Sequence, residues 1–235
     1  MNNKYLLAST LCGFIAVATT MGCTAPTIVH GTDASNGRTS AAGTGALTKV
    51  GDGANGVDFT RVANSGALIV AVASPLGADP NDWGCTYDNK TGLTWEVKTL
   101  SGLRAMSHTY TSYDSNAATN GGGVGTASGG SCATTGRCDT EKFVQDVNAA
   151  GMCGHIDWRM PSVRELNKLV RLGVSPTIDN AYFPNTVSGY YWSGSPLITV
   201  STHAWSISFD SGSSVIGVPF VRDGSYSVRL VRGEE

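Results

Sequence analysis

The chain has 235 residues, of which 41% are hydrophobic and 14% are charged, and its formal net charge is −2. The length allows one large domain or two small ones. Because 16 basic residues are balanced by 18 acidic residues and no basic run occurs, the composition argues against nucleic acid as a partner.

The N-terminal residues have the pattern of an export signal. Lys4 supplies the positive start, residues 6–18 form a short apolar core, and small residues follow. The core is shorter than a typical membrane span. We therefore expect a signal peptide over residues 1–22 and an exported protein of the cell envelope.

Residues 20–23, Thr-Met-Gly-Cys, resemble a bacterial lipobox, although Thr20 stands where an aliphatic residue is usual. The motif predicts lipidation of Cys23 and a membrane contact through the lipid, as in an outer-membrane lipoprotein. Cleavage after Ala18 or after Ala25 is the alternative, and the protein would then be periplasmic or secreted. Cysteine parity does not separate lipidation from cleavage after Ala25, because both leave an even set.

The remaining cysteines predict disulfides, because export carries them into an oxidising compartment. Four cysteines lie beyond residue 23, and they allow three pairings. Cys132 and Cys138 flank a short loop, so we pair them with each other and pair Cys85 with Cys153. A zinc site needs paired ligands at short spacing, which this set lacks. We expect no metal and no cofactor.

The middle of the chain divides into a linker and a domain. Residues 23–56 are rich in Ala, Thr, Gly and Ser and poor in large apolar side chains, which predicts a flexible tether. A folded domain is predicted over residues 57–235, beginning with two short strands joined by a turn at residues 63–66. Residues 114–137 are rich in Gly, Ser and Thr and predict a long surface loop.

Two short amphipathic helices are expected to pack on a sheet. The first covers residues 140–150, with Asp139 as its N-cap and Gly151 as its stop. The second begins at a capping box, residues 162–165, and ends at Gly173.

Alternation of polar and apolar residues predicts strands at residues 205–209 and 226–230. In the first strand, the serines are expected on the face opposite to the apolar side chains. Trp158, Trp192 and Trp205 are expected in the core. The helices, the antiparallel strands and the irregular loops together predict an α+β fold.

Four ordered motifs resemble the Lcl C-terminal domain family, over residues 57–233. They are Asp-Asn-Lys-Thr-Gly-Leu-Thr-Trp at 88–95, Asp-Trp-Arg-Met-Pro-Ser at 157–162, Tyr-Trp-Ser-Gly-Ser at 191–195 and Tyr-Ser-Val-Arg-Leu-Val-Arg at 226–232. The resemblance implies a C-type-lectin-like fold of the formylglycine-generating-enzyme type, in exported or surface proteins of which some bind sulfated glycans. The chain lacks a collagen repeat, the calcium motifs of sugar-binding animal lectins and the cysteine arrangement of the formylglycine-generating enzymes. Their oxidase activity is therefore not implied.

The late strands and their loops carry the candidate binding surface. Their side chains mix large amphipathic groups with small hydrogen-bonding groups, as recognition surfaces do. The candidate ligand-binding residues are Tyr190, Tyr191, Thr202, His203, Ser206, Ser208, Asp210, Arg222, Asp223 and Tyr226. The expected ligand is a protein or a glycan at the cell surface, and an ordinary hydrated sheet face is the alternative interpretation.

The common catalytic motifs are missing from the sequence. It has no GxSxG, HExxH or GxxxxGK[ST] pattern, and its four histidines are scattered. We therefore expect a non-enzymatic, adhesin-like surface lipoprotein that displays a C-type-lectin-like domain. The alternative is a hydrolytic or otherwise catalytic cell-envelope enzyme, which would need an acid/base pair converging in a pocket.

Overall fold

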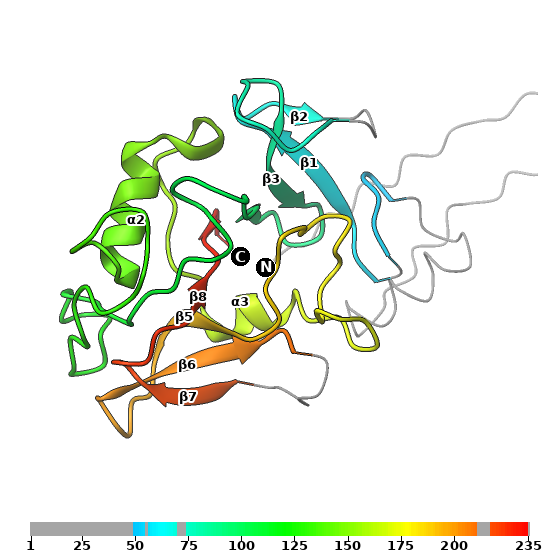
Figure 1. Cartoon of the computed structure of the whole chain (residues 1–235). Helices are drawn as coiled ribbons and strands as arrows, with labels where there is room; N and C mark the ends of the chain where they lie inside the picture. The colour runs from blue at the N-terminus through cyan, green and yellow to red at the C-terminus, as the bar shows by residue number, and fades with distance from the viewer. Residues whose placement is uncertain (1–48, 55, 70–73, 211–216, 235) are drawn as a thin grey trace, which may run out of the picture. The chain divides into compact units, whose positions relative to one another are not determined.

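The computed structural model describes residues 49–54, 56–69, 74–210 and 217–234. The predicted signal peptide, the predicted lipidation site Cys23 and most of the predicted tether lie outside the described residues. The described part mixes helices with mainly antiparallel strands, so the predicted α+β class is confirmed. In Figure 1, β1 to β3 lie at the top, β5 to β8 at the bottom and α2 at the left.

The larger sheet has five strands in the order β2-β1-β3-β4-β9, all paired antiparallel. Its strands are β1 (Phe59–Ala63), β2 (Leu68–Ile69), β3 (Trp83–Asp88), β4 (Thr94–Glu96) and β9 (Val231–Arg232). The predicted turn at residues 63–66 joins β1 to β2, and the Ala63 N–H donates to the Ala67 carbonyl at 2.8 Å.

The second sheet has four strands in the order β7-β6-β5-β8, of which only β8 runs parallel to its neighbour. Its strands are β5 (Tyr190–Pro196), β6 (His203–Ser208), β7 (Val218–Val221) and β8 (Ser227–Val228). The single strand predicted at residues 226–230 is wrong, because β8 ends at Val228 and β9 begins in the other sheet at Val231. Arg229 lies between them, fully buried, so this crossing ties the two sheets together.

Both predicted helices are present, and one is shorter than expected. Helix α2 (Thr140–Ala149) has the predicted Asp139 N-cap, and Gly151 follows it with a φ of 63°. Helix α3 (Val163–Asn167) has the complete predicted capping box, but it ends well before Gly173. The amides of residues 168–170 bond three residues back, so tighter turns replace the α-helix there. The 3₁₀ turn η1 (Met152–Gly154) connects α2 to the next segment.

Two apolar clusters form the core, one on each face of the second sheet. Tyr191 and Ile207 belong to one cluster, which also contains Phe59 and Leu166 from the larger sheet and from α3. The other cluster includes residues of α2, β3, β5 and β8 together with residues of η1 and of loops, and it contains Trp192 and Trp158. Trp158 and Trp192 are buried as predicted, whereas Trp205 is only partly buried.

A buried charged group lies where the two sheets meet. Glu96 accepts hydrogen bonds from the Lys98 ammonium at 2.8 Å and from the Leu230 amide at 2.9 Å. Arg229 donates to the Glu96 carbonyl and to the Thr186 hydroxyl, the latter at 2.7 Å. All three charged side chains are buried, so the core contains two cations and one carboxylate at this point.

Both predicted disulfides are present. The Cys85–Cys153 bond joins β3 to η1 across 68 residues, and the Cys132–Cys138 bond closes a separation of 6 residues. The contacts of the domain begin before Val57, because Asp52 pairs with Phe59 through two backbone hydrogen bonds of 2.8 Å. The Asp179 carboxylate also accepts a bond from the Ala54 amide at 2.9 Å, so the end of the predicted tether packs on the domain.

Candidate functional site

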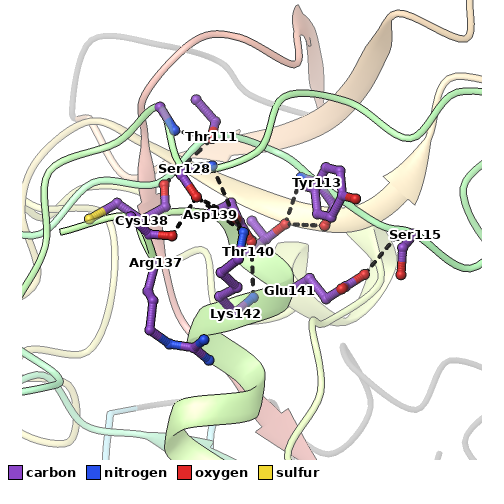
Figure 2. A network of polar contacts seen from close by, with 12 residues as sticks. Thr111, Tyr113, Ser115, Ser128, Arg137, Cys138, Asp139, Thr140, Glu141 and Lys142 are labelled. Atoms are coloured by element: carbon purple, nitrogen blue, oxygen red, sulfur yellow. Dashed lines mark hydrogen bonds and ion pairs between the residues drawn. The ribbon is translucent and has the colours of Figure 1, made fainter. Parts of the chain in front are cut away.

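Polar contacts around the first turn of α2 hold the loop of residues 109–131 in place (Figure 2). The buried Asp139 carboxylate accepts hydrogen bonds from the Lys142 amide and the Ser128 amide, both at 2.9 Å. The Lys142 ammonium lies 2.6 Å from the same carboxylate. The N-cap therefore fixes the helix and the loop in one arrangement.

The neighbouring residues of α2 extend this attachment (Figure 2). The Thr140 hydroxyl accepts from the Tyr113 amide at 2.9 Å and donates to the Tyr113 carbonyl at 2.8 Å. The Glu141 carboxylate accepts from the Ser115 amide at 2.7 Å. Residues 113–115 thus run along the first turn of α2, and Tyr113 and Asp114 form part of the wall of a cavity.

This cavity, which we call cavity A, has a volume of about 470 Å³. It lies between the loop of residues 112–120, the first turns of α2, and the β5 and β6 strands of the second sheet. Its charged lining residues are Asp114, Glu141, Arg159 and Arg222. Uncharged polar and apolar lining comes from Ser112, Tyr113, Asn116, Thr119, Asn120, Thr140, Val144, Gln145, Met160, Ser193, Gly194, Pro196 and Ala204.

The two guanidinium groups of cavity A are engaged by internal partners. Arg159 forms a two-pronged bond with the Glu165 carboxylate, at 2.6 and 2.9 Å, and this hydrogen bonding raises the pKa of Arg159. Arg222 donates to the Asn120 carbonyl at 2.7 Å and to the His203 carbonyl at 3.3 Å. Burial lowers the pKa of Arg222, and the nearby Asp114 charge partly offsets this effect.

The two carboxylates of cavity A also have structural partners. Asp114 accepts from the Asn116 amide at 2.9 Å and from the Thr119 hydroxyl at 2.7 Å, which closes the loop on itself. Glu141 holds Ser115 as described above. The groups facing the cavity are therefore fixed in position by the fold.

Several residues predicted to bind ligand are buried. The exposed fractions are 1% for Tyr191, 0% for Ser206, 1% for Ser208 and 3% for Arg222. The prediction of a displayed serine face on β6 is wrong, because apolar clusters cover both faces of this sheet. The Ser206 hydroxyl donates to the Val218 carbonyl at 2.7 Å, and the Ser208 hydroxyl accepts from the Asp210 amide at 3.0 Å. Of these four residues, Arg222 alone lines one of the two cavities described here.

Tyr190 and Tyr226, both predicted to bind ligand, lie together with Phe220, which was not among the predicted residues. The rings of Tyr190 and Tyr226 lie 5.7 Å apart, and Phe220 lies 4.7 Å from the first and 4.9 Å from the second. All three rings are partly exposed. Phe220 pairs with Ala204 across β7 and β6, and Ala204 lines cavity A, so the aromatic cluster adjoins the cavity. The short run Val-Pro-Phe-Val, residues 218–221, is rich in β-branched and aromatic residues, and this composition was the available signal for a strand containing Phe220.

The remaining predicted residues lie at the ends of β6 and beyond β7. Thr202 and His203 are adjacent, with Oγ1 and Nδ1 3.0 Å apart. Asp223 is exposed and contributes to raising the pKa of Tyr226, for which burial is the larger cause. Asp210 is exposed at the other end of β6, where the Ser188 hydroxyl donates to it at 3.2 Å. The ten predicted residues therefore do not form one continuous site.

No group of three or more His, Cys, Asp or Glu side chains suited to a metal ion occurs among the described residues. None of the helices in that part of the chain has the length and apolar character of a membrane-spanning segment.

Comparison with known proteins gives one match. No curated protein and no solved structure matches the chain. The family model of the Lcl C-terminal domain matches residues 84–232, which is more than half of the chain. Strands β1 and β2 lie outside this matched range, although they lie inside the predicted extent of 57–233. The chain belongs to the Lcl C-terminal domain family.

Proposed function

We propose that the protein is an exported, surface-anchored lipoprotein whose C-type-lectin-like domain binds a protein or glycan ligand without catalysing a reaction. Family membership, an α+β domain with long loops and the predicted signal with Cys23 support this proposal. The ligand would enter cavity A and extend over the aromatic cluster of Tyr190, Phe220 and Tyr226.

The observation that carries the proposal is the fixed mixture of groups around cavity A. Its volume of about 470 Å³ suits a small ligand or one side chain or sugar unit of a larger one. Carboxylates, amides and an aromatic ring line the same space, and their hydrogen bonds hold them before a ligand arrives. A surface that is organised in advance loses less conformational entropy on binding.

The hydrolytic alternative depends on Asp114 and Glu141, the two carboxylates that line cavity A. Each accepts hydrogen bonds that fix the surrounding loop, which favours a structural role for both. Ser193 is not positioned as a nucleophile, because its hydroxyl donates to the Trp205 carbonyl at 2.7 Å. No Cys or His is among the described residues that line this cavity.

Screening the purified protein on glycan and envelope-protein arrays would test the proposal. Gln145 is exposed on α2 and lines cavity A, so Gln145→Trp should block the cavity and reduce binding at least tenfold. Ala149→Trp is the matched control, because Ala149 is also exposed on α2 but lines neither cavity described here. Equal binding by both variants would contradict the assignment of cavity A. Turnover of a bound ligand that Glu141→Gln abolishes would instead support the enzyme.

The anchor requires a separate experiment. Cys23→Ala should move the protein from the membrane fraction to the aqueous fraction of the envelope if Cys23 carries the lipid. An unchanged distribution would contradict the lipoprotein assignment and would leave the proposal for cavity A intact.

A further inference from the structure

A second and larger cavity, which we call cavity B, lies beside the last turn of α2 and the Cys85–Cys153 disulfide. Its volume is about 700 Å³, within the range of small-molecule sites. It is lined by Asn64, Leu76, Gly77, Ala78, Thr99, Leu100, Ser101, Leu103, Arg104, Val147, Ala150, Gly151, Met152, Cys153 and Asn185. No residue of this lining belongs to cavity A.

The walls of cavity B combine apolar side chains from distant parts of the chain. Leu76, Leu100 and Leu103 come from loops, while Val147 and Met152 come from α2 and η1. Leu100 is 76% exposed and lines the cavity, so it offers apolar surface at the rim. These walls suit an apolar chain.

Arg104 is the one charged residue among the described lining of cavity B. Its Nη1 atom donates to the carbonyls of Gly84, at 2.7 Å, and Val97, at 3.1 Å. Its Nε and Nη2 atoms have no hydrogen-bond partner among the described residues. Neither atom is completely buried. The two bonds of Nη1 hold the guanidinium in place.

The charges behind Arg104 also favour an anion in cavity B. The buried group at the junction of the sheets contains one carboxylate, Glu96, and two cations, Lys98 and Arg229. Burial lowers the pKa of Lys98, and the positive charges of Arg229 and Arg104 act in the same direction. Arg104 thus adds a third cation beside this single carboxylate, and an anionic ligand at Arg104 would reduce the local excess. The Asp82 carboxylate lies beside Gly77, so that part of the lining is unfavourable for an anion.

We propose that cavity B binds a single-chain amphiphile with a carboxylate head, such as a free fatty acid. The head would accept hydrogen bonds from Nε and Nη2 of Arg104, and the chain would lie against Leu103, Val147 and Met152 and leave past Leu100. This site is independent of the ligand proposed for cavity A.

Calorimetric titration of the full chain, prepared without detergent and with both disulfides formed, would test the proposal. Decanoate should bind with saturation at one equivalent, 1-decanol should bind at least tenfold more weakly, and acetate should give no measurable binding. Equal affinity for decanoate and decanol would overturn the role of Arg104. Equal affinity for decanoate and acetate would overturn the role of the apolar walls.

Variants then locate the site. Leu100→Glu places a charged carboxylate where the apolar chain of decanoate would leave the cavity, and it should weaken decanoate binding at least tenfold. Ile156→Glu is the matched control, since Ile156 is also 76% exposed but does not line cavity B, and its binding should equal that of the native protein. Similar affinities for these two variants would overturn the assignment.

Arg104→Gln should bind decanoate and decanol with similar affinity. Its circular dichroism should match that of the native protein, which shows that the variant is folded. The Leu100 and Ile156 pair does not depend on that condition. Cosedimentation with phosphatidylglycerol vesicles distinguishes a membrane lipid from a free carboxylate. Binding to vesicles with no binding of decanoate would overturn the proposal.

Discussion

Replacement of Asp139 by alanine should damage the wall of cavity A and can be given a magnitude from the contacts in Figure 2. The variant removes the N-cap acceptor for the Lys142 amide, a loss of about 1 kcal/mol. It also leaves the half-buried Ser128 amide without its acceptor, which costs about 2 kcal/mol as long as the loop keeps water from that amide. The Lys142 side chain is 26% exposed and can regain water, so the lost ion pair adds little. The free energy of unfolding should fall by about 3 kcal/mol.

Asp139→Asn separates these contributions. Its amide oxygen can replace the cap acceptor, while its NH₂ group would face the Ser128 N–H, donor against donor. The asparagine variant should therefore lose about 2 kcal/mol, and urea unfolding of both variants measures the difference. A loss below about 1 kcal/mol for the alanine variant, or no loss for the asparagine variant, would refute the reasoning.

Three further changes can be checked by urea or thermal unfolding. Removing the Cys85–Cys153 disulfide should lower the free energy of unfolding by about 4 kcal/mol and removing Cys132–Cys138 by about 2 kcal/mol, because the first bond closes a loop of 68 residues and the second a loop of 6. Equal losses would contradict this estimate. Lys98→Met should lower the free energy of unfolding by about 3–5 kcal/mol, because the buried Glu96 carboxylate loses the cation that bonds it. Adding Glu96→Gln should recover part of that loss, and strictly additive losses in the double-mutant cycle would exclude coupling. Burial alone would raise the pKa of Glu165, but its bonds to Arg159 and Ser162 outweigh burial and hold the pKa below the usual 4.5. Its contribution to stability is then present above pH 4.5 and disappears as the pH falls through the lowered pKa. Glu165→Gln should therefore reduce the fall in the free energy of unfolding at acidic pH, and an unchanged fall would count against this role.

The features that could be predicted from the sequence are those determined within a few residues. The Asp139 N-cap, the capping box at residues 162–165 and the turn at residues 63–66 depend on side-chain bonds or backbone geometry over short separations. The Cys132–Cys138 pair follows from a short loop in the same way. Such signals remain visible without knowledge of the tertiary packing.

The features that could not be predicted depend on segments that are distant in sequence. The serines of β6 look exposed by their alternation, yet one core cluster includes Trp192 and Val228, which cover that side of the sheet. Lys98 is likewise typical of an exposed strand end, but it is buried against Glu96 and above the Phe143 ring, 4.8 Å away. A polar residue in an alternating pattern is exposed only if nothing packs on its face, and the pattern does not contain that information.

Cavity A could not be predicted either, because its lining comes from segments that are distant in sequence. Helix α2 contributes to the lining of both cavities. Val144 and Gln145 of this helix line cavity A, and Val147 lines cavity B. Asp139 fixes the first turn, and at the other end the Asn148 amide group exchanges hydrogen bonds of 2.9 and 2.8 Å with the Trp158 backbone. Coupling between sites needs an element with two arrangements that each ligand biases differently. A helix held at both ends offers one arrangement, so the two cavities should bind their ligands independently.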